Sequence, residues 1–267
     1  MTDTHAAQRV LVLGAYGLIG ASLVRDLSAH AMVVTGFGRS AQSARRVHPD
    51  IDWHIGDLRD FTRAQDWQAA LAGVDAVVNA AGALQDGPRD DLVAVHHHAI
   101  AALAQACAEQ GVALVQISAA GARPEARTEF MRSKAAGDAA VQNAQGEHWI
   151  LRPGLVLART GYGGTALLRM LAAVPVVQPL ALAKAPIQSI GIDDRASAVR
   201  ACLERRIPSG TCADLLEQEP QPLASVIAAM RDWLGFAPAR AVIALPDWAL
   251  APIAKGADAL AYLGWRS

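Results

Sequence analysis

The chain has 267 residues, of which 52% are hydrophobic and 18% are charged. Its 24 basic and 25 acidic residues nearly cancel and form no single-sign stripe or tail, which argues against a nucleic-acid partner and against an acidic disordered extension. A chain of this length can bury a large core, either as one α/β domain or as one domain with a small appendage.

The first eight residues are polar and include Asp3, which is not typical of a signal peptide. The uncharged run Val10–Val24 is too short and too rich in glycine to span a bilayer, and two prolines interrupt the run Met170–Ala183. We therefore expect a cytoplasmic protein, associated with a membrane only if the natural chain continues beyond residue 267. Three cysteines without CxxC spacing are expected to be buried and reduced: Cys107, Cys202 and Cys212.

The first predicted element joins an apolar run to three evenly spaced glycines. Val10–Leu13 is a predicted strand, Gly14, Gly17 and Gly20 follow, and Ala21–Ala29 is a predicted helix. Strand, tight turn and helix N-terminus form the arrangement that holds a dinucleotide diphosphate, because bare amides and the positive end of the helix dipole face the anion. The alternative is a βα turn without a ligand. The other cofactor-binding candidates in this turn are Tyr16, Leu18 and Ile19.

Apolar runs and helical patterns then alternate as far as residue 152. Continuous apolar strands separated by helices predict an α/β fold with a doubly wound parallel sheet and a ligand at the carboxyl ends of its strands. The further predicted strands are Met32–Phe37, Ile51–Ile55, Ala76–Asn79, Ala113–Ser118 and Trp149–Arg152. The further predicted helices are Ala41–Arg46, Ala64–Leu71, Leu92–Gln110 and Arg127–Gln145.

The pattern changes after residue 153, where glycines and prolines interrupt it. We expect a dinucleotide-binding domain over residues 1–154 and a smaller C-terminal substrate or lid region over 155–267, with residues 187–205 interleaved with the first domain's sheet. The predicted elements here are a helix Thr165–Ala172, a strand Ile187–Ile192, a helix capped by Asp193-Asp194 and ending near Arg205, a helix Leu223–Leu234, a strand Ala241–Leu245 and a helix Pro246–Leu263.

The residues after the second predicted strand bear on the choice of cofactor. Proteins that select NAD usually place a carboxylate here for the ribose hydroxyls, but this chain has no Asp or Glu between Asp26 and Asp50. It has Arg39 and Ser40 instead, and a guanidinium binds a 2′-phosphate in bidentate fashion. NADP(H) is therefore the expected cofactor, with NAD(H) as the alternative. Arg39 as a solvated loop cation is the competing interpretation.

Polar and small residues follow the next predicted strands. Asp57 can accept a hydrogen bond from an adenine amino group or can cap the turn that begins at Leu58. The segment Asn79-Ala80-Ala81-Gly82 lets the backbone lie against the adenosine half of a cofactor, and Ser118 ends the fifth strand at the same edge of the sheet. The adenosine candidates are therefore Asp57, Leu58, Ala80, Ala81 and Gly82.

In this order the motifs resemble the short-chain dehydrogenase/reductase superfamily over residues 9 to 194. Arg152-Pro153-Gly154 and Ile192-Asp193-Asp194 match its extended and atypical branches. Among the atypical members, the chain is similar to the NADPH-binding accessory subunit of respiratory complex I and to bacterial relatives with a DoxX-like membrane segment. The resemblance implies a Rossmann fold in which Ser118 polarises a carbonyl, Lys134 holds the nicotinamide ribose and Pro153 lines the cofactor.

One residue departs from the superfamily pattern. Phe130 stands four residues before Lys134, where the superfamily has the tyrosine that acts as general acid, and a phenyl ring has no proton to give. The candidates for a substitute acid are Tyr162, on a glycine-flanked loop, His97 and water. A metal site at the three consecutive histidines 96–98 is not expected, because consecutive helical side chains diverge by about 100°.

Three functions are consistent with this pattern. The first is an oxidoreductase with a modified active site, acting on a small molecule that the sequence does not identify. The second is a non-catalytic nucleotide-binding module for assembly or redox sensing, with a protein or membrane-domain partner at the C-terminal region. The third, a nucleotide-sugar epimerase or dehydratase, is less favoured because those reactions need the missing tyrosine.

Overall fold

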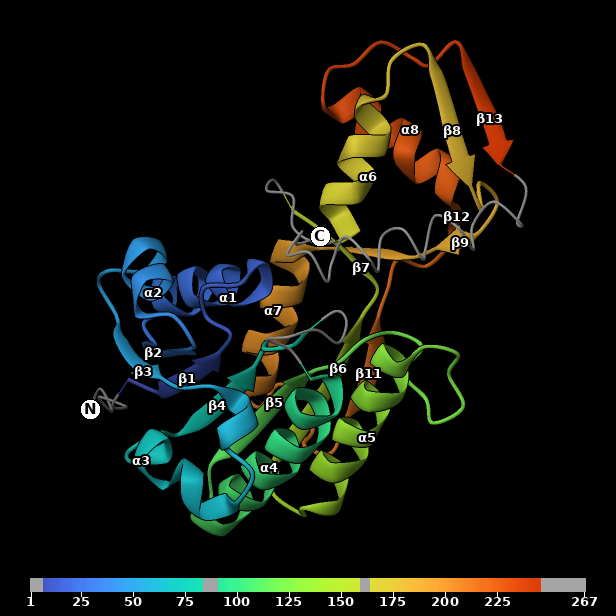
Figure 1. Cartoon of the computed structure of the whole chain (residues 1–267). Helices are drawn as coiled ribbons and strands as arrows, with labels where there is room; N and C mark the ends of the chain where they lie inside the picture. The colour runs from blue at the N-terminus through green and yellow to red at the C-terminus, as the bar shows by residue number, and fades with distance from the viewer. Residues whose placement is uncertain (1–6, 84–90, 159–163, 246–267) are drawn as a thin grey trace. The chain divides into compact units, whose positions relative to one another are not determined.

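The computed structural model describes residues 7–83, 91–158 and 164–245, and the chain divides into two compact units (Figure 1). The first unit comprises the chain up to Pro153 together with Ile192–Leu215, and the second comprises Gly154–Gly191 and the chain from Leu216 onward. No helix among the described residues combines the length and apolar character needed to cross a membrane. That the second unit serves as a substrate or lid domain stays a prediction.

A seven-stranded parallel sheet forms the centre of the first unit, in the order β11-β6-β5-β4-β1-β2-β3. The chain proceeds outward from β1 in one direction through β2 and β3 and then in the other through β4. The predicted doubly wound parallel sheet is thereby confirmed. The strands are β1 (Arg9–Leu13), β2 (Val33–Gly38), β3 (Asp52–Ile55), β4 (Ala76–Asn79), β5 (Ala113–Ile117), β6 (His148–Pro153) and β11 (Cys212–Leu215).

Alternate residues of β1 point into two separate cores. Val10 and Val12 pack with α1 and α7 on one face of the sheet, whereas Leu11 and Leu13 pack with α4 and the segment before it on the other (Figure 1). Burial on both faces explains why the strand is apolar from Val10 to Leu13. The helical elements are α1 (Leu18–Ala29), α2 (Ala41–Val47), η1 (Leu58–Asp60), η2 (Ala64–Trp67), α3 (Gln68–Leu71), π-helical η3 (Ala94–His98), α4 (Ala99–Gln110), α5 (Glu129–Asn143) and α7 (Ile192–Leu203).

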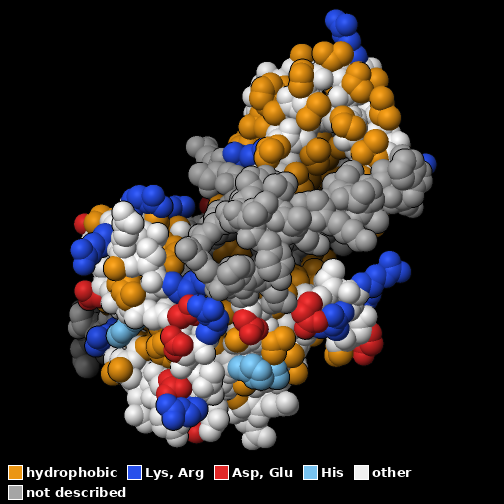
Figure 2. Space-filling model, in the orientation of Figure 1, with side chains coloured by type: hydrophobic (Ala, Val, Ile, Leu, Met, Phe, Trp, Pro, Cys, Tyr) orange, Lys and Arg blue, Asp and Glu red, His pale blue; other side chains and the backbone are white. Residues whose placement is uncertain are grey.

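The second unit has a small core around Ala172, Leu180 and Ile227. Within it, β7 pairs with β10 and β8 with β13 in parallel, and β9 pairs with β12 in antiparallel fashion. Large apolar side chains stay exposed on this unit, among them Met170 and Trp233 (Figure 2). Its elements are β7 (Leu155–Leu157), α6 (Gly164–Ala173), β8 (Val177–Ala181), β9 (Pro186–Ile187), β10 (Ser189–Gly191), β12 (Gln221–Pro222), α8 (Leu223–Trp233) and β13 (Ala241–Leu245).

Several sequence predictions need correction. The expected strand Ile187–Ile192 is two short strands, β9 and β10, and Ile192 already begins α7, so Asp193 and Asp194 lie in the first helical turn rather than at the cap. The strands β8 and β11 were not predicted, because Pro179 interrupts the first and the second has alternating polar residues. Cys212 lies in β11 and is exposed rather than buried. The predicted helix Pro246–Leu263 lies outside the described residues.

Arg195 is an unusual core residue of α7. Its side chain is 0% exposed, and burial lowers its pKa to about 10. Nη2 donates to the carbonyl oxygen of Ile19 at 3.4 Å, while Nε and Nη1 are buried without a partner in the described part of the chain. A buried cation without compensating acceptors is destabilising.

We expect Arg195→Met to raise the free energy of unfolding by about 1–4 kcal/mol, the range found when buried ionic groups are replaced by apolar ones. Urea denaturation of the nucleotide-free protein measures the change. The control is Arg200→Met on the same helix, where a partly exposed guanidinium donates to Asp26 at 3.3 Å and the expected loss is below about 1 kcal/mol. Destabilisation by Arg195→Met would contradict the assignment of an uncompensated charge.

Candidate functional site

The turn after β1 brings two loops into backbone contact. Gly14 has a φ of +69°, and a Cβ there would lie 2.9 Å from the Cα of Ala81, in the loop after β4. Its amide donates to the carbonyl oxygen of Phe37 in β2 at 2.9 Å. Both the backbone conformation and the close approach therefore require glycine at this position.

The turn leads directly into the N-terminus of α1. Gly17 is the N-cap residue without a side-chain hydrogen bond, and the first turn contains no acidic residue. A Cβ at Gly20 would lie 2.2 Å from the carbonyl oxygen of Gly14, so this glycine lets the helix pack on the turn. The amides of Leu18 and Ile19 lie in the first turn, where helical amides have no intrahelical acceptor. The residues present fit a diphosphate, which would receive these amides and the positive end of the helix dipole.

Tyr16 lies against the end of β2. Its hydroxyl oxygen accepts from the amide of Arg39 at 3.0 Å, and a Cβ at Gly38 would lie 2.3 Å from the tyrosine ring. The ring also stacks on Trp53 with centroids 5.9 Å apart. Tyr16 therefore holds the backbone at Arg39, whose side chain is exposed, and Ser40 caps α2 by accepting from the amide of Ser43 at 3.2 Å.

Asp57 has the role of a turn cap in this structure. Its carboxylate accepts from the backbone amide of Arg59 at 3.0 Å and from two guanidinium nitrogens of Arg59 at 3.1 and 2.8 Å. These hydrogen bonds lower the pKa of Asp57, with a smaller contribution from the charge of Arg39. The structure therefore shows the capping alternative, Leu58 is buried behind it, and an adenine contact at Asp57 stays a prediction.

The loop after β4 crosses the carboxyl edge of the sheet next to the glycine turn. The amide of Ala80 donates to the carbonyl oxygen of Leu13 at 3.1 Å, and the amide of Ala81 donates to the side chain of Asn79 at 3.1 Å. A Cβ at Gly82 would lie 3.0 Å from His96 Nε2 and 3.4 Å from Lys134 Nζ. The predicted segment 79–82 is thus brought beside Lys134.

His96, and not the predicted His97, is the histidine that lies at the carboxyl edge of the sheet. His96 is 1% exposed, and its Nε2 accepts from the amide of Ala83 at 3.1 Å. Its Nδ1 therefore carries the proton and donates to Ser133 Oγ at 3.0 Å, while Ser133 donates to the carbonyl oxygen of Phe130 at 3.0 Å. His97 is only partly buried and stacks on His98 with ring centroids 5.0 Å apart, so these two rings do not diverge as predicted, whereas His96 is buried away from solvent.

His96 is consequently a neutral link between the loop after β4 and helix α5 and not an acid at neutral pH. Burial, with a smaller contribution from the charge of Lys134, lowers its pKa to about 2. Sequence reasoning missed it because the π-helical η3 rotates the side chains relative to a regular helix.

Phe130 and Lys134 lie one turn apart on α5. Phe130 is partly buried and meets His96 edge-on, with ring centroids 5.5 Å apart. Lys134 Nζ donates to the carbonyl oxygen of Ile117 at 3.2 Å, and burial lowers the pKa of this lysine to about 8 against the opposing effect of Asp138. The tyrosine position is thus occupied by a ring without a proton, beside a buried lysine.

Ser118 belongs to a buried polar group that the sequence analysis did not identify. Its hydroxyl donates to Asp138 Oδ2 at 2.9 Å, and Arg152 Nε donates to the same oxygen at 2.8 Å. Asp138 is 1% exposed, and burial is the main cause that raises its pKa. The spacing in the sequence could have identified Asp138, because it follows Lys134 by four residues and therefore lies on the same face of the helix.

Pro153 is the predicted residue that completes the described part of the edge. Pro153 ends β6, and its carbonyl oxygen accepts from the amide of Ala120 at 2.9 Å, which ties it to the loop that follows Ser118. Tyr162 lies outside the described residues. Among the described residues, no cluster of three His, Cys, Asp or Glu side chains could hold a metal ion.

Comparisons with known proteins agree with this geometry. A family described as NAD(P)H-binding matches residues 14–169. The mitochondrial NADH dehydrogenase [ubiquinone] 1 alpha subcomplex subunit 9 of Arabidopsis thaliana is 28% identical over 151 residues, which are 55% of this chain and 38% of that protein. The chain therefore spans less than half the length of this relative.

Solved structures share the fold. The enzyme WbmG of Bordetella bronchiseptica, in complex with NAD and UDP, matches with a TM-score of 0.73 and 19% identity over 91% of this chain and 84% of that one. The UDP-glucose 4-epimerase of Thermus thermophilus, in complex with NAD, matches with a TM-score of 0.68 and 22% identity over 93% of each chain. At these identities the likeness concerns the fold.

The buried neutral His96 predicts a loss of stability in acid. Below the ordinary pKa of 6.5 the unfolded chain binds a proton that the native state does not bind, so the free energy of unfolding falls as pH decreases, by up to about 1.4 kcal/mol per pH unit. Urea denaturation between pH 7.5 and 4.5 measures the slope. His96→Gln should reduce this pH dependence of the free energy of unfolding, and the exposed control His98→Gln should not change it. Equal slopes in all three proteins would contradict the assignment of His96 as a buried neutral ring.

Proposed function

Because the chain belongs to the NAD(P)H-binding family, we propose that it binds NADP(H) and acts as an oxidoreductase of the atypical short-chain dehydrogenase/reductase type. The observation that carries the proposal is the N-terminus of α1, uncapped by any side chain and free of acidic residues in its first turn, which follows the tight turn at Gly14. Gly17, Leu18, Ile19 and Gly20 would hold the diphosphate.

The charges at the end of β2 support NADP(H) over NAD(H). Arg39 is exposed there, and Tyr16 holds its backbone. Arg59 already binds the nearby Asp57, and Arg39 carries a positive charge that also acts on this carboxylate. A 2′-phosphate is attracted to that charge and can accept from a guanidinium and from the Ser40 hydroxyl.

The residues for the nicotinamide half lie at the ends of β5 and β6. Lys134 would donate to the ribose, Pro153 would line the ring, and Ser118 would face the reacting group of the substrate. Nicotinamide, when bound, supplies or accepts a hydride. The roles of these residues rest on their place in the superfamily pattern and on their burial at one edge of the sheet.

A second candidate function is a non-catalytic nucleotide-binding module. The observation that favours it is Phe130, which removes the usual proton donor, together with the similarity to a subunit of an NADH dehydrogenase complex. In that case the nucleotide would stabilise the fold or report redox state, and a protein partner would bind the chain. A nucleotide-sugar reaction, as in the epimerase with a similar fold, has less support because it too needs the tyrosine.

NADPH is expected to bind more tightly than NADH. Removing the guanidinium in Arg39→Ala should weaken NADPH binding about 10- to 100-fold and change NADH binding less than about 3-fold, because only the 2′-phosphate loses a charge-assisted contact. Isothermal titration calorimetry, supported by thermal shifts, measures both affinities.

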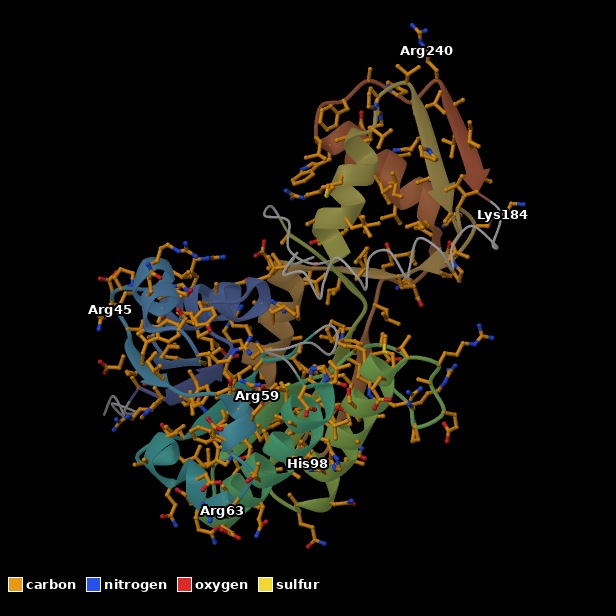
Figure 3. The ribbon with its side chains drawn as sticks, in the orientation of Figure 1. Arg45, Arg59, Arg63, His98, Lys184 and Arg240 are labelled. Carbon is orange, nitrogen blue, oxygen red and sulfur yellow. The ribbon has the colours of Figure 1, made fainter. Side chains whose placement is uncertain are left out.

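The matched control is Arg63→Ala, which removes an exposed arginine of the same unit that is paired with Asp66 at 2.7 Å (Figure 3). It should leave both affinities unchanged. Equal binding of NADPH and NADH by the unmodified protein would remove the basis for an NADP(H) preference.

Restoring the missing proton donor is expected to raise activity. Phe130→Tyr places a phenol one turn from Lys134, and a positioned general acid accelerates proton transfer about 10²–10⁴-fold. Oxidation of NADPH with small aldehydes and ketones should increase by at least about 100-fold, while Phe130→Leu should show no increase. Tight NADPH binding without any gain in Phe130→Tyr would favour the non-catalytic function.

A further inference from the structure

Only one oxygen of the Asp138 carboxylate accepts hydrogen bonds from other described residues. Both donors, Ser118 Oγ and Arg152 Nε, reach Oδ2, whereas Oδ1 is buried and has no partner in the described part of the chain. Burial with one oxygen unpaired disfavours the ionised carboxylate and so favours a protonated Asp138, and the proton can be exchanged with Ser118 only at Oδ2. The site therefore contains a second titratable group besides Lys134, at a position where the mechanism lacks an acid.

The hydrogen bond to Asp138 determines whether Ser118 can donate a hydrogen bond to a ligand or only accept one. A serine hydroxyl has one proton, and that proton is directed to the carboxylate, so only lone pairs of Oγ remain for another contact. With Asp138 ionised, Ser118 can accept a hydrogen bond from an alcohol but cannot donate one to a carbonyl. With Asp138 protonated, the bond can reverse, and Ser118 can then donate to a carbonyl oxygen.

We propose, on the premise of the proposed NADP(H)-dependent oxidoreductase function, that Asp138 is a positioning residue that takes and returns a proton through Ser118 in place of the missing tyrosine. The substrates are alcohols and the carbonyl compounds formed from them. Ser118 contacts the reacting oxygen, and Asp138 acts only through Ser118.

The step balances in both directions. In oxidation, the alcohol O–H proton passes to Ser118 Oγ while the proton of Ser118 passes to Asp138, and the C–H hydride goes to the oxidised nicotinamide ring. The alcohol thus loses two electrons, and a C=O bond forms. In reduction, the proton of Asp138 passes through Ser118 to the carbonyl oxygen as its carbon receives the hydride. After the product leaves, Asp138 exchanges its proton with water along the same path.

The surroundings of Asp138 act on its protonation in opposite directions. Burial raises its pKa by favouring the neutral acid, whereas the hydrogen bonds from Ser118 and Arg152 and the charges of Arg152 and Lys134 favour the carboxylate. On the neighbouring strand β11, Cys212 and Asp214 act electrostatically on Arg152, and the register places Asp214 opposite Arg152. Alcohol oxidation is therefore expected to need the higher pH range and carbonyl reduction the lower one.

The coupling between Ser118 and Asp138 is testable without nucleotide. NMR titration of the whole chain labelled with ¹³Cγ-aspartate should show one carboxyl that titrates above the usual range, and this signal should be absent from Asp138→Asn or, if that variant is unfolded, from Asp138→Glu. Ser118→Ala should move its midpoint to higher pH, because the carboxylate loses a donor. The control Ser133→Ala removes an equally buried hydroxyl that binds His96 and Phe130 instead. A midpoint unchanged in Ser118→Ala would overturn the proposal.

The proton role is tested with cyclohexanol and 1-phenylethanol as probes. The rate of NADP⁺ reduction should rise with pH through the midpoint found by NMR, and Asp138→Asn should lower it about 10²–10⁴-fold while NADPH binding is retained. Adding Phe130→Tyr to Asp138→Asn should restore most of the rate, because the phenol supplies a separate proton path, and a purely structural role of Asp138 would not allow this rescue.

Two outcomes contradict the proton role. One is a folded Asp138→Asn variant with the rate and pH profile of the unmodified protein, and the other is an unmodified protein that binds NADPH but oxidises neither alcohol. Failure of the proposed function has a different signature, because the unmodified protein would then not bind NADPH, or Phe130→Tyr would also oxidise neither alcohol, whatever the carboxyl titration shows.

Discussion

The backbone contact between Gly14 and the loop at Ala81 determines the geometry of the whole edge. It joins the turn after β1 to the loop after β4, the two neighbouring strands from which the chain proceeds in opposite directions. Through this contact the N-terminus of α1 and Gly82 lie at one edge of the sheet. A side chain at Gly14 would separate the loops and, with them, the two halves of the expected nucleotide site.

Buried polar groups connect this edge of the sheet to helix α5. His96 links Ala83 to Ser133 as a neutral ring, and Lys134 reaches the end of β5. Each of these groups has a hydrogen-bond partner, which is the condition for placing polar atoms in a core. Removing one member leaves its partner uncompensated, and the same holds for the partly exposed Arg152 and the buried Asp138, which lie 2.8 Å apart.

Because of Phe130, the fold does not by itself imply the reaction that is usual in the superfamily. The sheet and the glycine turn agree with the NAD(P)H-binding family to which the chain belongs, and the solved structures with NAD share the fold. A fold admits many functions, however, and the phenyl ring removes the group on which the superfamily's usual reaction depends. What this chain can do therefore depends on which other group exchanges a proton near Ser118.

The sequence by itself determined the doubly wound sheet, its core strands and the glycine turn, because continuous apolar runs and evenly spaced glycines are local signals that only one arrangement satisfies. Tertiary structure alone decided that His96 faces the edge and that Asp138 binds Ser118. Each of these depends on a contact between segments distant in the chain or on a one-residue change of helical phase. Such contacts leave no periodic trace in the sequence, so they became visible only once β5, β6 and α5 were packed together.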